Sequence, residues 1–391
     1  MNTPIDPADT KTMIYNGLFG WIEDPAVIQN IKMVGGSVTS TKYAAAVVAY
    51  MNGGTVYNCV SDIDIVYGLQ SGGVVGRAEK GEKNIIKGCV NHTEVTVPED
   101  KEDKSIFLGG VVGCAGNAEI SYCVNYGTVT SKNSLNYSLA GGIVGMQGAS
   151  SSPTNVYNCM DMGVITSHVS EQTKYYGAGG ICGKAAHVSF AEIADCFAVG
   201  TYVCDKEDGA AGIAGFVDPS KLVTIDNLYT NAPKASGIDE LQQCADTVIL
   251  KTEEMKGAAG IAKMKLNSAW VAEADMFPTI DVAKIDAAEN APEIPAETTT
   301  ETTVATTTAV TTEATTTEAV TDTTTEAVTE PEETTAPVSD TDPDAVITDD
   351  DMVSYPIVPT RNNTVIIVIL AVAIVADAVV MVVVMRSKKN G

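Results

Sequence analysis

The cysteines of this 391-residue chain are the residues whose type and spacing could most readily do chemistry. Five of the nine occupy one position of an internal repeat: Cys59, Cys89, Cys123, Cys159 and Cys196. If the repeats stack, neighbouring thiols come within disulfide range, so one interpretation is a column that binds metal or forms disulfides between repeats. The other interpretation is a column of small core residues. We favour the second, because an in-register column offers no tetrahedral site with His and an odd number of cysteines does not fit a complete disulfide framework.

Other groups capable of catalysis form no recognisable pattern. The histidines, at positions 92, 168 and 187, fall at unrelated repeat positions, and the sequence has neither an HExxH nor a GxSxG motif. We therefore predict no enzyme, no catalytic residue, no metal site and no cofactor. Asn and Asp recur one position before or two after the repeat cysteines, as at Asn58, Asn125, Asp161 and Asp195. They are predicted to cap turns or to form a side-chain ladder, with calcium binding as the alternative.

The repeat that positions these residues begins with a glycine-rich element. Five copies read GGVVG, GGVVG, GGIVG, GGICG and AGIAG, and they end at Gly76, Gly113, Gly145, Gly183 and Gly215. Two altered copies end at Gly20 and Ala49, and successive copies are 27 to 38 residues apart. A second element follows each copy, as in Val56-Tyr57-Asn58-Cys59, and a third often lies six residues after the cysteine. Short β-branched runs bounded by Gly and Asn are typical of strands.

Stacking explains why such a short unit is repeated. One coil of two or three strands cannot bury its own apolar face, whereas stacked coils align equivalent residues into a continuous core. The chain is therefore predicted to be all-β, with a parallel β-solenoid of about seven glycine-rich coils over residues 15–230. The glycines are expected to supply positive φ and close backbone approach at the corners. Repeat-length variation predicts loops at residues 97–108, 131–140 and 166–178.

Two segments flank the predicted solenoid. Residues 231–286 are predicted to be a small mixed C-terminal cap, in which Thr252 caps a helix that continues to about Leu266, with Glu253 and Glu254 in its first turn. Residues 1–14 are expected to be a truncated or poorly ordered start. They lack the basic start and apolar run of a signal peptide, so we infer that the true N-terminus is missing or miscalled.

Acidity is concentrated in a stalk. Residues 287–360 hold 23 Thr and 17 Asp or Glu, with no Lys or Arg. They therefore carry 17 of the 26 net negative charges of the whole chain. This composition predicts a disordered segment, which would span ~50 Å as a flexible coil and at most ~230 Å when extended. The chain has no cluster of Lys and Arg, and we therefore exclude nucleic acid as a partner.

A membrane anchor is predicted near the C-terminus. Residues 365–385 are apolar except for Asp377, and as a helix they would reach ~31 Å, about one bilayer core. Arg386, Lys388 and Lys389 follow, which places the tail 386–391 in the cytoplasm and the bulk of the chain outside a plasma membrane that it crosses once. The alternative is a tail-anchored protein facing the cytoplasm. Asp377 costs ~3 kcal/mol at a bilayer centre, and it is either tolerated or paired with a partner helix.

The repeat pattern is similar to a known family. GGxVG followed by I-x-N-C and G-x-V, over roughly residues 15 to 230, resembles the GLUG repeat of bacterial surface proteins and of non-catalytic regions of IgA-specific metallopeptidases. The segment LNSAWV at 266–271 is similar to the piece that often closes such arrays. The resemblance implies a surface solenoid without catalysis of its own.

Function at this stage is a hypothesis with one alternative. We predict a cell-surface interaction protein, adhesin-like, that displays the solenoid away from the membrane and binds an extracellular protein or glycan. The alternative is the non-catalytic fragment of a larger surface hydrolase or metallopeptidase whose catalytic domain lies upstream.

Overall fold

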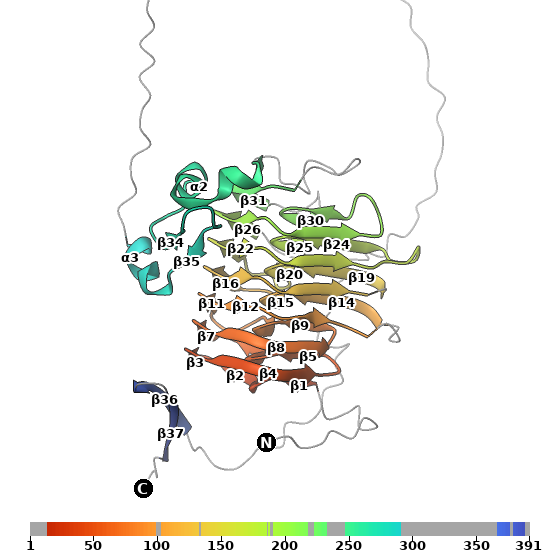
Figure 1. Cartoon of the computed structure of the whole chain (residues 1–391). Helices are drawn as coiled ribbons and strands as arrows, with labels where there is room; N and C mark the ends of the chain where they lie inside the picture. The colour runs from red at the N-terminus through yellow and green to blue at the C-terminus, as the bar shows by residue number, and fades with distance from the viewer. Residues whose placement is uncertain are drawn as a thin grey trace, which may run out of the picture. The chain divides into compact units, whose positions relative to one another are not determined.

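The computed structural model describes residues 14–98, 103–132, 134–185, 187, 191–217, 223–232, 247–290, 366–375 and 378–387. Up to residue 232 these residues form short strands that pair in parallel into four sheets, here called A to D (Figure 1). Sheets A, B and C contain seven strands each. The prediction of an all-β fold with parallel strands is confirmed, and seven strands per sheet match the seven glycine-rich copies. This arrangement is compatible with the predicted solenoid, and we call it the stack.

In each turn the chain passes through sheets A, B, C and D in order, and we number the turns coil 1 to coil 7. Sheet A contains β1 (Tyr15–Asn16), β5 (Tyr43–Ala45), β9 (Gln70–Gly72), β14 (Asp103–Gly109), β19 (Ser134–Gly141), β24 (Tyr175–Gly179) and β29 (Ala210–Ala211). Sheet B contains β2 (Phe19–Glu23), β6 (Val48–Asn52), β10 (Val75–Ala78), β15 (Val112–Ala115), β20 (Val144–Gln147), β25 (Cys182–Ala185) and β30 (Ala214–Val217).

Sheets C and D complete each coil. Sheet C contains β3 (Val27–Gln29), β7 (Gly54–Tyr57), β11 (Asn84–Lys87), β16 (Ala118–Ser121), β21 (Thr154–Tyr157), β26 (Ala191–Ala194) and β31 (Val223–Asp226). Sheet D branches at β8 (Val60–Tyr67), which also pairs with β4 (Lys32–Thr39). One branch is β12 (Val90–Asn91), β17 (Val124–Asn125), β22 (Met160–Asp161), β27 (Phe197–Ala198), β32 (Leu228–Thr230) and β33 (Thr247–Ile249). The other is β13 (Val95–Thr96), β18 (Thr128–Ser131), β23 (Val164–Ser167) and β28 (Thr201–Cys204).

Equivalent repeat residues face one another across neighbouring coils. Ile86 pairs with Val56 on one side and with Ile120 on the other, and Val75 pairs in the same way with Val48 and Val112. These side chains are fully buried and belong to one core cluster that runs through the stack. The core is therefore built from columns of like residues, as stacking of short coils requires.

Two of the predicted loops contain long strands. β14 covers residues 103–108, half of the predicted loop 97–108, and β19 covers residues 134–140, most of 131–140. The reason is that both segments carry apolar residues that fill buried positions, such as Phe107 and Leu139. The prediction of surface loops there was wrong. Between β23 and β24, residues 168–174 do form a connection without strands.

The corner between sheets C and D uses the left-handed region of backbone space in all seven coils. The φ angles there lie between 49° and 66° at Asn30, Asn58, Gly88, Tyr122, Asn158, Asp195 and Asn227. Asn, Asp and Gly tolerate this conformation best, and Tyr122 is the exception. Of the glycines expected to supply positive φ at the corners, only Gly88 does so at this one, and none of the glycines described with positive φ belongs to a glycine-rich motif.

Residues 247–290 form a unit that we call the flank cap. It contains β33, the 3-10 helix η1 (Thr252–Met255), α2 (Gly257–Lys263), the antiparallel pair β34 (Trp270–Val271) and β35 (Thr279–Ile280), η2 (Val282–Lys284) and α3 (Ile285–Glu289). In place of the single predicted helix, the chain breaks at Lys256, which is extended, and at Gly257, with φ of 63°. Lys251, not Thr252, is the N-cap residue of η1.

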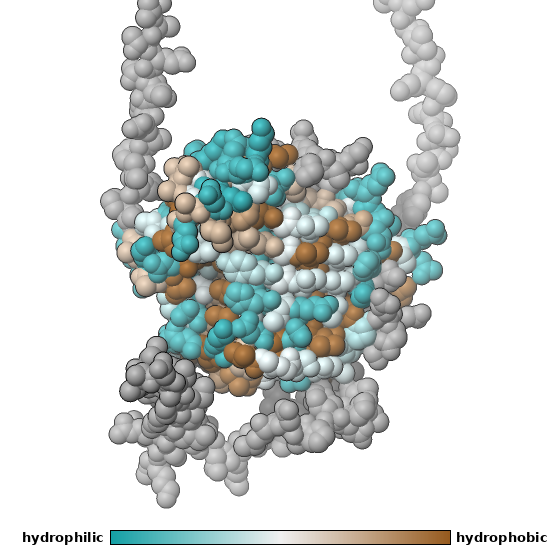
Figure 2. All heavy atoms as spheres, in the orientation of Figure 1, coloured by the Kyte–Doolittle hydropathy of each residue, from teal (hydrophilic) through white to brown (hydrophobic). Residues whose placement is uncertain are grey.

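The flank cap covers one end of the stack and then runs down its side (Figure 1). Near the end, Leu250, Met255 and Met264 share a buried cluster with Phe197 and Tyr229 of coils 6 and 7. Farther along the side, Tyr57 donates to the Val282 carbonyl at 3.5 Å, and Lys87 pairs with Glu289 at 2.6 Å. Hydrophilic side chains gather at the end next to α2 (Figure 2). The cap thus reaches back to coils 2 and 3.

The apolar C-terminal segment forms a separate antiparallel hairpin of β36 (Ile366–Val375) and β37 (Ala378–Ser387). This differs from the helix predicted over 365–385, and the high content of β-branched Val and Ile favours strands there. None of the helices in the described part of the chain is long and apolar enough to cross a membrane. The predicted stalk beyond residue 290 and the tail 388–391 lie outside the described residues.

Candidate functional site

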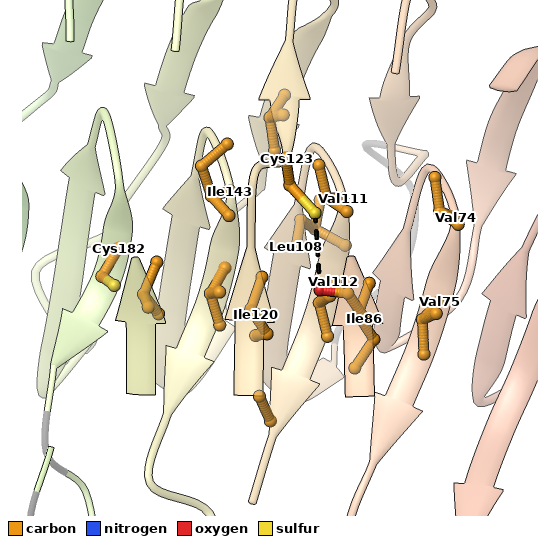
Figure 3. Packing of buried hydrophobic residues seen from close by; sticks show 14 of the residues in the cluster. Val74, Val75, Ile86, Leu108, Val111, Val112, Ile120, Cys123, Ile143 and Cys182 are labelled. Atoms are coloured by element: carbon orange, nitrogen blue, oxygen red, sulfur yellow. Dashed lines mark hydrogen bonds between the residues drawn. The ribbon is translucent and has the colours of Figure 1, made fainter. Parts of the chain in front are cut away.

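The cysteine column lies inside the core. Cys59, Cys89, Cys123, Cys159 and Cys196 are fully buried free thiols of the main core cluster. Each Sγ donates to the carbonyl two residues before it, at distances from 3.1 to 3.5 Å. Figure 3 shows Cys123 among Val111, Ile120 and Ile86, with its hydrogen bond to the Ile86 carbonyl. The geometry is that of small side chains packed in a core.

Burial also lowers the reactivity of thiols in this column. It raises the pKa of Cys89 and of Cys159 well above the ordinary value of a thiol, because the charged thiolate is poorly solvated in the core. The thiolate is the form that attacks electrophiles and binds metals, so a thiol that stays protonated does neither well. Among the residues that the structure describes, no group of three or more His, Cys, Asp or Glu side chains could hold a metal ion.

A second buried column runs two residues after the cysteines, and we call it the inner polar ladder. Its members are Ser61, Asn91, Asn125, Asp161 and Thr230, all fully buried, with Ala198 at the equivalent position of coil 6. Asn91 Nδ2 donates to Asn125 Oδ1 at 2.9 Å, and Asn125 Nδ2 donates to Asp161 Oδ1 at 2.8 Å. A side-chain ladder at this position was one of the sequence interpretations. Inside the core these bonds replace those that the amides would make to water.

The inner polar ladder also holds the turn that follows it. Asn125 Nδ2 donates to the Gly127 carbonyl at 3.1 Å, and Asn125 Oδ1 accepts from Gly127 N at 3.2 Å. Asn91 and Asp161 make corresponding bonds to Thr93 and Gly163. One side chain therefore fixes its own turn and joins its coil to the next.

Asp161 is the one carboxylate of the inner polar ladder, and its hydrogen-bond donors among the described residues are neutral. It accepts from Asn125 Nδ2, from Gly163 N at 3.3 Å and from the Tyr202 hydroxyl at 3.1 Å. Tyr202 occupies the position where other coils carry Val95, Val129 or Ile165, and its hydroxyl reaches back one coil. Burial raises the pKa of Asp161 to about 7, against the lowering effect of these three donors.

The motif glycines make room for both columns. A Cβ at the last glycine of any motif, Gly76, Gly113, Gly145, Gly183 or Gly215, would lie less than 3.0 Å from a backbone atom. The second glycine of each motif faces the inner polar ladder, so that a Cβ on Gly110 would meet the Asn125 side chain and one on Gly142 would meet Asp161. The expected close backbone approach is thus present, whereas the contact with the ladder was not predicted.

Two buried cations outside the main core were also missed from the sequence. Arg77 pairs with Glu79 at 2.6 Å and donates to Gln70 Oε1 at 2.7 Å. The fully buried Lys184 has its Nζ 4.9 Å from the centre of the Tyr175 ring and 3.2 Å from His187 Nδ1. Both residues follow the motif glycine directly, at a position where the seven coils carry different residue types. These cations are held by partners within the fold.

The remaining predicted residues do not converge on one place. His92 stacks on Tyr126, His168 pairs with Asp205 at 3.2 Å, and His187 lies beside Lys184. Asp377, Lys388 and Lys389 lie outside the described residues, and only the backbone of Arg386 is described, within β37. The membrane role of these four residues stays a prediction.

The fold and these columns define a repetitive parallel-β scaffold whose repeated residues serve the core. No protein-family model, no curated protein and no solved structure matches the chain. The similarity of its motifs to GLUG repeats therefore stays a prediction based on the quoted residues.

Proposed function

We propose that the chain is a cell-surface interaction protein in which a β-solenoid presents a variable outer surface to an extracellular protein or glycan. One observation carries the proposal: the residues repeated from coil to coil point inward, and those that vary point outward. In sheet C the inward row is Val56, Ile86, Ile120, Val156 and Ile193, all fully buried. The neighbouring outward row is Thr55, Ile85, Glu119, Asn155 and Glu192, all partly exposed.

This division is what a display scaffold needs. The inward row holds only Val and Ile, so each coil offers the same surface to the next one. The outward row carries hydroxyl, aliphatic, amide and acidic residues at a regular spacing of ~4.8 Å, set by strand pairing. A partner that binds along the stack would read these side chains, while the core stays unchanged. The flank cap covers part of sheet C and packs on β17, β22, β27 and β32 of sheet D, which leaves the other branch of sheet D, from β13 to β28, as the more open outer face for binding.

Placement on a membrane is the second part of the proposal. Residues 365–385 are long enough to cross a bilayer once as a helix, which satisfies its own backbone hydrogen bonds, whereas an isolated hairpin leaves open edges in lipid. The acidic, Thr-rich residues 287–360 would hold the solenoid away from the membrane. The resemblance to GLUG repeats supports a surface location and a scaffold without catalytic activity.

Limited proteolysis of intact cells tests this placement. With a signal sequence supplied, a soluble protease should cut within residues 291–360 and release the solenoid as a compact fragment, because extended polar segments are the preferred sites of cleavage. Antibody against the stack should then detect the fragment in the supernatant. If cleavage requires broken cells, the chain faces the cytoplasm and the surface function is excluded.

A binding experiment tests the interaction itself. The released fragment should bind members of a glycan and extracellular-protein array. A Val164→Glu and Val203→Glu double variant, on the exposed face of sheet D, should lose that binding while it keeps the wild-type far-UV spectrum. Binding that survives these changes would move the binding face away from β23 and β28.

A further inference from the structure

The two ends of the stack differ in how well they are covered. Coil 1 carries four of the eleven large apolar side chains described as exposed: Leu18, Trp21, Val27 and Val34, which are 45% to 69% exposed. At the other end, the flank cap packs on coils 6 and 7, and the residues of β30 are buried or half-buried. In Figure 2, apolar residues gather at the end of the stack where Figure 1 places β2 and β3.

Among the described residues, the strands of coil 1 pair on one side only. β1, β2 and β3 are terminal in sheets A, B and C, and β4 pairs with β8 alone. Such an edge is a template for another strand. β1 and β3 are very short, and β4 has register shifts around Gly35 and Gly36, both of positive φ. β2, with five residues and an unbroken register to β6, is therefore the best edge for pairing.

We propose that this edge is a self-association surface, on which β2 of one chain pairs antiparallel with β2 of a second copy around Trp21. Trp21 is the middle residue of β2, so a two-fold axis there sets the two indoles against each other. Each indole is already stacked on Tyr50 of its own chain, with ring centres 4.4 Å apart and planes at 22°. In this register Phe19 lies opposite Glu23 of the second copy, and no like charges face each other.

Charge and composition favour a second copy over other occupants. Residues 14–40 contain only Glu23, Asp24 and Lys32 as charged residues, and Lys32 is paired with Asp62 at 2.8 Å. Two copies of an acidic chain therefore meet where their repulsion is lowest.

Symmetry then limits the assembly to two chains. A head-to-tail contact would continue into a fibre, but the flank cap occupies the end that it would require. A head-to-head contact uses the same surface on both copies and closes after one interface. The product is a dimer with two cap-bearing ends pointing away from the contact.

Disulfide cross-linking of the full chain in membranes tests this proposal. Trp21→Cys places two thiols opposite each other in the dimer, so mild oxidation should give a covalent dimer on a non-reducing gel. Val164→Cys, 44% exposed in the middle of the stack, is the matched control, and it should show only the wild-type background. Equal cross-linking of the two variants overturns the proposal. A Trp21→Cys adduct with a different protein also overturns it, in favour of that partner.

A second measurement uses variants that keep Trp21 and replace another apolar side chain of the proposed contact. The detergent-solubilised wild type should have twice the protein mass of a monomer by light scattering, and Leu18→Glu or Val27→Glu should convert it to the monomer. Circular dichroism checks that each variant keeps its β spectrum. A wild type that is monomeric over the whole accessible concentration range contradicts the dimer, whatever the variants do.

Discussion

In coils 2 to 5 the cysteine column and the inner polar ladder run side by side, two residues apart, and both are fully buried. They differ in the strength of the bonds that join one coil to the next. Each thiol donates to a carbonyl of its own coil, and its contact with a carbonyl of the preceding coil is long, at 3.7 to 4.0 Å. The amides of the ladder donate to the next coil at 2.8 to 2.9 Å. Equal burial therefore does not mean equal importance, because a thiol is a weak donor, whereas the loss of a ladder amide leaves buried polar groups of the neighbouring coils with fewer partners.

The largest effect is expected from breaking the ladder at its centre. Asn125→Leu removes the bonds to Asn91, Asp161 and Gly127 and leaves buried polar atoms of all three with fewer partners. Each such buried group costs roughly 1–3 kcal/mol, so we expect the free energy of unfolding to fall by about 4 kcal/mol. Urea denaturation measures this loss. If Asn125→Leu lowered the free energy of unfolding by less than Cys123→Val does, the ladder would not be the more important of the two columns.

The next effect concerns pH and Asp161. Its folded pKa of about 7 lies above the ordinary value of 3.8, so the folded state holds a proton that the unfolded state has lost. Stability from this group is full below pH 4 and is lost as the pH rises toward 7, at about 1.4 kcal/mol per pH unit. Asp161→Asn should remove that dependence. Between pH 5 and 7 we expect wild type to lose ~2 kcal/mol relative to Asp161→Asn in parallel urea titrations.

The Tyr202 hydroxyl provides a control for this pH effect. Tyr202→Phe removes a donor to Asp161 Oδ2 and should shift the loss of stability toward higher pH, because the carboxylate is then less well stabilised. An unchanged pH profile in Asp161→Asn would show that other groups cause the dependence.

The smallest effect is expected in the cysteine column. Cys123→Val replaces one small apolar side chain by another of similar size and should cost only ~1 kcal/mol, whereas Cys123→Asp should disrupt the stack. Because the column thiols are free, mild reduction of wild type should leave Tm unchanged. A drop in Tm on reduction would instead reveal disulfides that stabilise the protein.

Much of the stack could be predicted from its sequence because the repeat imposes it locally. The glycine-rich copies predict the number of coils, and Asn58 or Asn158 before a cysteine indicates a turn. The positions of Val56, Ile86 and Ile120 predict a shared inward row, which strand pairing confirms. In each case a short pattern is enough, since every coil repeats the environment of the one before.

The features that escaped prediction depend on contacts between distant residues. Tyr202 bonds to Asp161 from 41 positions away, and Asn267 of the flank cap bonds to Tyr122, 145 positions away. Nothing in the local sequence of the cap indicates that it turns down the side of the stack. The sequence pattern predicts loops where β14 and β19 lie, because the burial of their apolar residues depends on neighbouring coils.

Hydrogen exchange on the pair Asn125→Leu and Cys123→Val tests most directly the claim that the inner polar ladder joins the coils. The two substitutions lie two residues apart in the same coil and both place an aliphatic side chain in the core. Asn125→Leu should speed amide exchange in β12, β17 and β22, the strands that the ladder joins, while Cys123→Val should leave exchange there close to wild type. Equal acceleration in both variants, or faster exchange in Cys123→Val, would contradict the account.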